Sequence, residues 1–181
     1  MNSLYGEVAD NIWQKAKNIK LFICDIDGVF SDGRIYLGND GEELKAFHTK
    51  DGYGIKALGA SGVDVAVITG RKSNIVQTRM TALNVKHIVQ GQEDKLPALK
   101  AMVESLNLSP EQVAYIGDDM PDFACLNYVG LSIAVHDAHP AILNICDYIT
   151  YTRGGFGAVR EACDLMMQSQ NTLADATGAS I

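Results

Sequence analysis

The sequence predicts an α/β fold with a doubly wound, Rossmann-like parallel sheet and helices on both faces. Short, continuously apolar segments recur along the chain, and segments with helical patterns separate most of them. The chain has 181 residues, of which 47% are hydrophobic, so it can build one well-packed core but not two ordinary ones. We therefore expect residues 1–181 to form a single domain.

The first predicted elements are a helix and a buried strand. In residues 6–18, Val8, Ile12, Trp13 and Ala16 share one helical face. Residues 20–25, KLFICD, are too few and too continuously apolar for an exposed helix, and they suit a strand buried on both faces. The remaining predicted strands are 63–69, 87–90, 113–118, 131–135 and 147–150, and the remaining predicted helices are 73–84, 93–106, 120–129 and 157–168. Ser109, Pro110 and Gln112 form a helix-start pattern.

Two segments depart from the alternation of strands and helices. Residues 34–47 contain two short strand-like runs around Asn39-Asp40-Gly41, a pattern that predicts a protruding β-hairpin. Residues 169–181 are small and polar, and we expect them to form a flexible C-terminal tail.

Composition narrows the possible functions. The formal net charge of −7 argues against nucleic acid or an anionic membrane as the main partner. No segment approaches the ~20 apolar residues of a membrane span, and the first residues lack the apolar run of a signal peptide. The four cysteines show no CxxC spacing, which is typical of reduced thiols. We therefore expect a cytoplasmic protein.

Polar residues gather where the predicted strands end. Asp25 and Asp27 follow the first strand, Thr69-Gly70-Arg71 ends the second, and Gly117-Asp118-Asp119 with Asp122 follows a later one. The ends of parallel strands meet at one edge of a sheet, so several carboxylates should crowd together. Such a crowd requires a cation or raised pKa values. Oxygen ligands favour Mg²⁺, and the absence of Cys and His argues against zinc.

Each motif alone has an ordinary structural explanation. A DxD pair is often a loop or a cap, a TGR triplet is often a turn, and GDDxxD can cap the helix that follows it. A single lysine such as Lys95 is usually a solvated surface residue. Their occurrence in order, each at a predicted strand end, instead indicates one shared site.

Together these motifs resemble those of the haloacid dehalogenase superfamily. The resemblance covers about residues 20–165 and rests on D25-x-D27-G-V, a hydrophobic residue before T69-G70-R71, Lys95, and G117-D118-D119-x-x-D122. Longer stretches, FHTKDGYGIKAL, VITGRKS, DAHP and RGGFGAVREACDLMM, are similar to superfamily members that remove phosphate from a sugar acid in the synthesis of the lipopolysaccharide inner core. The resemblance implies a Mg²⁺-dependent phosphatase with a small anionic sugar-phosphate substrate.

The resemblance also implies roles for the two aspartates of the first motif. Asp25 is the expected nucleophile, which forms an aspartyl-phosphate. Asp27 is the expected general acid for the leaving sugar oxygen and then the general base for water. We expect crowding beside Asp25 to raise the pKa of Asp27. An acid two residues after the nucleophile favours the hydrolysis of phosphate esters over carbon–halogen cleavage.

The other motifs supply ligands and charge in the same comparison. The expected ligands of Mg²⁺ are the Asp25 carboxylate, the Asp27 backbone carbonyl and Asp118, with Asp122 as a weaker ligand or one step removed from the metal. The Thr69-Gly70 pair is expected to bind phosphate through the threonine hydroxyl, and Lys95 to add a fixed positive charge.

The hairpin is too small to serve as the large cap domain of many superfamily members. We therefore expect a neighbouring subunit to cover the site, and the resemblance implies a homotetramer in which the C-terminal tail reaches a neighbour's site. Arg71, Lys50 and Arg34 are candidate partners of the sugar carboxylate. The histidines His48, His87, His136 and His139 are expected to be structural.

Two alternatives stay open at this point. The substrate could be another sugar acid phosphate, such as a nonulosonate 9-phosphate, because the motifs are shared. A phospho-receiver signalling domain also combines a parallel sheet, carboxylates, Mg²⁺, Thr and Lys. Its phosphorylated aspartate ends the third strand, whereas the third predicted strand here, 87–90, is followed by no aspartate at that place.

Overall fold

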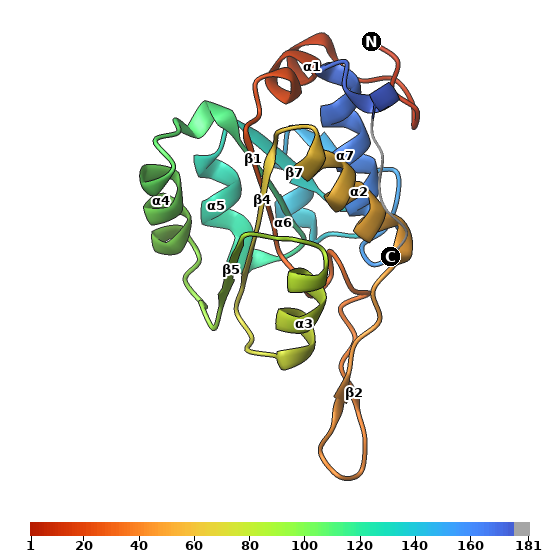
Figure 1. Cartoon of the computed structure of the whole chain (residues 1–181), viewed down its shortest axis with the longest axis vertical. Helices are drawn as coiled ribbons and strands as arrows, with labels where there is room; N and C mark the ends of the chain where they lie inside the picture. The colour runs from red at the N-terminus through yellow and green to blue at the C-terminus, as the bar shows by residue number, and fades with distance from the viewer. Residues whose placement is uncertain (176–181) are drawn as a thin grey trace.

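The computed structural model describes residues 1–175 and contains one six-stranded sheet and a separate hairpin (Figure 1). Neighbouring strands of the sheet are parallel and follow the order β5-β4-β1-β6-β7-β8. The strands are β1 Leu21–Cys24, β4 Asp64–Thr69, β5 His87–Gln90, β6 Val113–Gly117, β7 Leu131–Ala134 and β8 Tyr148–Ile149, and the hairpin pairs β2 Tyr36–Leu37 with β3 Glu43–Leu44. The predicted fold class is confirmed.

Helices cover both faces of the sheet. In Figure 1, α1, α2 and α7 lie together on one side of the strands, and α4 and α5 lie on the other. The α-helices are α1 Asp10–Lys17, α2 Thr49–Ala60, α3 Asn74–Ala82, α4 Leu96–Ser105, α5 Phe123–Tyr128, α6 Pro140–Leu143 and α7 Ala158–Ser169. Single 3-10 turns are η1 Pro110–Gln112, η2 Met120–Asp122 and η3 Leu173–Asp175.

Sequence patterns did not predict α2, although this helix packs closely against α7. Three glycines, Gly52, Gly54 and Gly59, lower its intrinsic helix propensity, so its pattern did not predict a helix. The packing explains one of them, because a Cβ added at Gly54 would lie 2.9 Å from Cδ of Arg160 in α7. Close approach of the two helices therefore favours glycine where local propensity does not.

Two of the predicted helices are shorter in the structure than the sequence indicated. The predicted helix 6–18 begins only at Asp10, because the preceding residues fold back and the Val8 N–H donates a hydrogen bond to the Met1 carbonyl. The Ser109 pattern forms a complete capping box but starts only the 3-10 turn η1, and the chain enters β6 directly after it.

Strand β1 lies in the middle of the sheet and sets the position of the polar strand ends. Its four residues are completely buried. Cys24 at its end is in register with Val67 of β4 on one side and Ile116 of β6 on the other. The segments that follow β1, β4 and β6 therefore emerge at the same edge of the sheet.

The hairpin projects from the body of the molecule, as predicted for residues 34–47 (Figure 1). Ile35, Leu37 and Leu44 are exposed there. At the other end of the chain, residues 169–175 include the last residue of α7 and the turn η3, and the rest of the predicted tail, 176–181, lies outside the described residues. Within residues 1–175, the helices are all too short or too polar to cross a membrane.

Candidate active site

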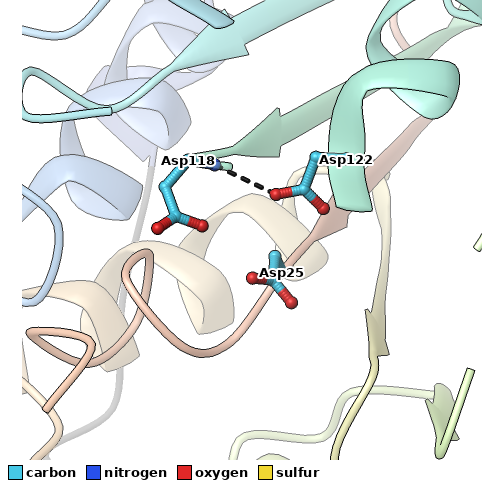
Figure 2. A group of neighbouring side chains, drawn as sticks. All are labelled: Asp25, Asp118 and Asp122. Carbon is cyan, nitrogen blue, oxygen red and sulfur yellow. Dashed lines mark hydrogen bonds between the residues drawn. The ribbon is translucent and has the colours of Figure 1, made fainter. Parts of the chain in front are cut away.

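Three carboxylates meet at the edge of the sheet (Figure 2). Asp25 follows β1, Asp118 follows β6 and Asp122 ends η2, and each offers an oxygen within 4.8 Å of the others. The Asp118 N–H donates a hydrogen bond of 3.0 Å to Oδ2 of Asp122. Asp25 and Asp122 are buried, and Asp118 is half-buried. The sheet register therefore produces the crowding that the motifs predicted.

Lys95 joins this cluster from the residue before α4. Its Nζ lies 2.7 Å from Oδ1 of Asp25 and 2.7 Å from Oδ1 of Asp122, and the residue is only 3% exposed. The Tyr115 hydroxyl donates to the same Asp122 oxygen at 2.7 Å. Both Asp122 oxygens thus accept hydrogen bonds from the protein, which favours an orienting role for Asp122 over direct metal ligation.

Burial and mutual repulsion raise the pKa values of two of these acids. Burial, followed by the charge of Asp122, raises the pKa of Asp25 to about 7, although Lys95 opposes the shift. Burial, followed by the charge of Asp25, raises the pKa of Asp118 to about 8. Burial works against the charged form of Lys95, but Asp25 and Asp122 raise its pKa to about 12. One buried cation faces three acids, so negative charge is in excess.

This excess of oxygen-borne negative charge is what a divalent cation neutralises. The group contains carboxylates and no histidine or cysteine, which suits Mg²⁺ better than zinc. The residues present therefore fit a magnesium ion held by Asp25 and Asp118, with Asp122 orienting the Asp118 backbone.

A cavity of about 500 Å³ opens beside the cluster. Thr69, at the end of β4, is 2% exposed and contributes to its wall. The cavity is lined by Asp25, Asp27, Gly33, Thr69, Gly70, Arg71, Glu93, Lys95, Asp118, Asp119, Pro121 and Asp122. The structure thus brings eight of the predicted site residues together, and it adds Gly33, Glu93, Asp119 and Pro121, which the motifs did not single out for the site.

Lys45 is a neighbour of the site that sequence reasoning missed. Its side chain is 2% exposed, its Nζ pairs with the Asp27 carboxylate, and it lies 3.3 Å from Oε1 of Glu43. Arg71 donates to the other oxygen of Glu43 at 2.9 Å. Asp27 was expected to be crowded by Asp25, whereas the contact the structure shows is with Lys45.

The alternation of residues after the hairpin turn was the sequence signal that could have placed Lys45 beside the site. Glu43 and Lys45 point to one side and the exposed Leu44 to the other, as in any extended strand. The inner side of the hairpin therefore bridges Asp27, after β1, and Arg71, after β4.

The other two candidate cations lie elsewhere in the chain. Arg34 has a side chain that is 76% exposed and pairs with Asp32 at 3.7 Å. Lys50 is exposed in the first turn of α2. Neither of them lines the cavity within one chain.

The fold and this site define the class of protein. Residues 85–161 match a family model described as haloacid dehalogenase-like hydrolase. This match covers less than half of the chain and agrees with the class that the motifs resemble, and relatives that match the whole chain confirm the sequence-based prediction.

Full-length relatives specify the family. A 3-deoxy-D-manno-octulosonate 8-phosphate phosphatase of Yersinia pestis is 53% identical over 181 residues, which cover 100% of this chain and 97% of the relative. A crystal structure of the Yersinia pestis phosphatase superposes with a TM-score of 0.98 at 53% identity, covering 100% of this chain and 98% of that one. The chain belongs to the family of 3-deoxy-D-manno-octulosonate 8-phosphate phosphatases.

A second relative was solved with ligands. The phosphatase of Moraxella catarrhalis, described as a complex with a magnesium ion, a phosphate ion and a KDO molecule, has a TM-score of 0.90 and 44% identity, covering 92% of this chain and 95% of that one.

Proposed function

We propose that this chain hydrolyses 3-deoxy-D-manno-octulosonate 8-phosphate to 3-deoxy-D-manno-octulosonate and phosphate in lipopolysaccharide inner-core synthesis, with Mg²⁺ as cofactor. The observation that carries the proposal is the buried Asp25–Lys95–Asp122 cluster beside Asp118, which opens into the cavity. Relatives that match the chain over its whole length carry the name of this activity.

Asp25 performs the first step as nucleophile. One of its carboxylate oxygens bonds to phosphorus, and the bond between phosphorus and the sugar oxygen breaks. Asp27 lines the same cavity and gives its proton to the departing sugar oxygen. The free sugar acid leaves, and Asp25 carries the phosphoryl group.

Water completes the cycle in the second step. Asp27, now deprotonated, removes a proton from a water molecule, and the water oxygen attacks phosphorus. The bond between phosphorus and the Asp25 oxygen breaks, which releases inorganic phosphate and restores the Asp25 carboxylate and the protonated Asp27.

Charge control makes these steps possible. Asp25, the Asp27 backbone carbonyl and Asp118 would hold Mg²⁺, which would supply positive charge that offsets the repulsion between nucleophile and substrate. Lys95 holds the Asp25 carboxylate in place through its 2.7 Å contact. Thr69 provides a hydroxyl donor for a phosphoryl oxygen from the end of β4.

We further propose that residues 1–181 act as one domain within a cytoplasmic homotetramer. The free thiols of Cys24, Cys125, Cys146 and Cys163 are typical of a reducing compartment. Leu37 is 70% exposed and Leu44 is 64% exposed on the hairpin, and a neighbouring subunit would cover them. Arg34, on the same hairpin, and Lys50 would then reach a sugar carboxylate only across subunits.

A panel of phosphate esters tests the proposal. Purified protein is assayed for phosphate release with Mg²⁺ and with a chelator, on 3-deoxy-D-manno-octulosonate 8-phosphate, a nonulosonate 9-phosphate and simple sugar phosphates. We expect the highest kcat/KM on the octulosonate ester and loss of activity with chelator. A preference for the nonulosonate ester would contradict the proposed substrate.

The receiver-domain alternative is not retained. The family assignment argues against it, and β5 ends at Gln90, so the strand has no aspartate at its end to be phosphorylated.

A further inference from the structure

Glu161 is a buried carboxylate in α7 that the mechanism above does not use. It is completely buried and accepts four hydrogen bonds. Oε1 accepts from the Tyr148 hydroxyl at 2.8 Å and from the Tyr151 N–H at 2.8 Å. Oε2 accepts from the Thr152 N–H at 3.0 Å and from the Thr152 hydroxyl at 2.7 Å. A buried charge with this many donors fixes the backbone of residues 151 and 152.

The fixed backbone belongs to residues 150–157, which we call the bracing loop. This loop contacts the segment that follows β1. The Gly155 N–H donates to the Val29 carbonyl at 2.8 Å. A Cβ added at Gly154 would lie 1.7 Å from the Gly28 carbonyl oxygen, so the two backbones are in direct contact and position 154 requires glycine.

Gly28 transmits this contact to the catalytic carboxylates. It directly follows Asp27 in the chain, and a Cβ added at Gly28 would lie 2.0 Å from Oδ2 of Asp118. A shift of the bracing loop would therefore move the backbone next to Asp27 and free space beside Asp118.

The bracing loop also contacts the segment after β7. The Gly154 N–H donates to the Asp137 carboxylate at 3.0 Å. Two residues later, the His139 N–H donates to the Asp118 carbonyl at 2.8 Å. Both segments that flank the cluster thus depend on the position of one loop.

Asp164 offers an internal comparison in the same helix. It is 1% exposed and accepts hydrogen bonds from the Tyr5 hydroxyl at 2.9 Å and from Nε of Arg160 at 2.8 Å and 2.9 Å. These partners belong to the N-terminal segment and to α7 itself. Asp164 is therefore a buried, hydrogen-bonded carboxylate like Glu161, but its hydrogen bonds do not reach the bracing loop.

We propose that Glu161 is a positioning residue for phosphoryl transfer: it holds the bracing loop against Gly28 and so fixes Asp27 and Asp118. This inference rests on the proposed function. Glu161 touches neither substrate nor metal in this role and acts only through the loop.

Glu161→Gln and Asp164→Asn form the first matched pair. In Glu161→Gln, an amide NH₂ faces the donors of residue 151 or 152 and cannot accept from them. Displacing reacting groups by about 1 Å can cost 10²-fold in rate, so we expect kcat to fall about 10- to 100-fold with KM little changed. Asp164→Asn should keep kcat within about twofold, because no reacting group moves.

Hydrogen exchange supplies a readout that a loss of global stability does not reproduce. In Glu161→Gln, amides of residues 26–33 should exchange faster while those of β1 and β6 stay protected. In Asp164→Asn, exchange in residues 26–33 should match the wild type.

A second pair of variants tests the role of Glu161 if Glu161→Gln does not fold. Thr152→Val and Tyr5→Phe each remove one hydroxyl donor to a buried carboxylate of α7. We expect Thr152→Val to lower kcat about threefold and Tyr5→Phe to leave it unchanged. Equal kcat values within each pair, or unchanged exchange in residues 26–33, would overturn the proposal.

These outcomes are separable from failure of the proposed function. The rates are measured both on the octulosonate ester and on p-nitrophenyl phosphate, which needs no recognition of the sugar. A wild type inactive on the octulosonate ester but active on p-nitrophenyl phosphate contradicts the proposed substrate, and the variant pairs still test Glu161. A wild type inactive on both esters contradicts the proposed function, and the exchange measurement still tests the loop.

Discussion

The floor of the site and the hairpin above it are built in opposite ways. At the floor, Asp25, Asp122 and Lys95 are almost completely buried and bonded to one another. In the hairpin, strands β2 and β3 have two residues each, and Leu37 and Leu44 are exposed. The floor is stabilised by a central strand of the sheet, whereas a two-stranded hairpin has little stability of its own.

We infer that the floor of the site carries the chemistry and that the hairpin helps to enclose the substrate. One chain supplies the proposed nucleophile, the proposed acid, the proposed metal ligands and the fixed cation Lys95, all from segments at one sheet edge. The hairpin contributes only its inner side, where Glu43 and Lys45 contact Arg71 and Asp27. We infer that its apolar outer side is completed by another subunit. Changes at the floor should therefore abolish turnover, and changes in the hairpin should alter assembly first.

Asp27→Asn should give the largest effect. Asparagine cannot donate a proton to the sugar oxygen, and general acid–base catalysis contributes 10²- to 10⁴-fold, so we expect kcat to fall about 10³-fold. Binding of Mg²⁺, measured by calorimetry, should persist, because the backbone carbonyl and the other carboxylates remain. Wild-type turnover in this variant would remove Asp27 from the acid–base role.

Lys95→Met should give the second-largest effect. We expect kcat to fall about 10²-fold, because the substitution removes a fixed charge beside the proposed nucleophile. Lys86→Met is the matched control, since Lys86 is an exposed lysine paired with Asp64 at the other end of β4. Steady-state kinetics on both variants gives the comparison. Equal effects of the two substitutions would contradict a special role for Lys95.

Leu44→Glu should separate the hairpin from the floor. A charge on the outer side of the hairpin should dissociate the assembly in sedimentation velocity and lower kcat/KM about tenfold, with the fold intact. Leu4→Glu is the matched control, because Leu4 is 65% exposed and Leu44 is 64% exposed. An assembly unchanged by Leu44→Glu would mean that the hairpin is not the interface.

Asp51 links α2 to α7, outside both the floor and the hairpin, and should affect stability more than activity. It is completely buried in α2, and its Oδ1 accepts from the Arg160 N–H at 2.8 Å. Burial raises its pKa from 3.8 to about 7, although the hydrogen bond from Arg160 opposes the shift. Between these two values the folded state holds a proton that the unfolded state has lost.

Stability from this group is therefore full below about pH 4 and is lost as the pH rises towards 7, up to about 4 kcal/mol. Asp51→Asn does not titrate, so its unfolding free energy should fall less than that of the wild type between pH 5 and pH 8. Urea denaturation at several pH values measures the difference. Parallel pH profiles of the two proteins would contradict the shifted pKa.

Local patterns predicted the sheet and the floor of the site. The continuously apolar strands fixed where the chain is buried, and the register of β1 with β4 and β6 then placed Asp25, Thr69 and Asp118 together. The helix α2 could not be predicted in this way, because its glycines serve contact with α7 rather than local propensity.

Lys45 and Glu161 show a second limit of sequence reasoning. A charged residue in a hairpin and one in a helix usually face solvent. They are buried against partners outside their own hairpin or helix, Asp27 for Lys45 and Thr152 for Glu161. Such contacts become visible only when the fold brings the segments together.

The most direct test of the central claim is to trap the phosphorylated enzyme. The protein is mixed with substrate and Mg²⁺, quenched in acid within one turnover, reduced with borohydride and digested for mass spectrometry. An acyl phosphate is reduced to an alcohol, so the account predicts homoserine in place of Asp25 and unmodified Asp27, Asp118 and Asp122. Modification at another residue, or phosphate release with no modified peptide at any time, would contradict it.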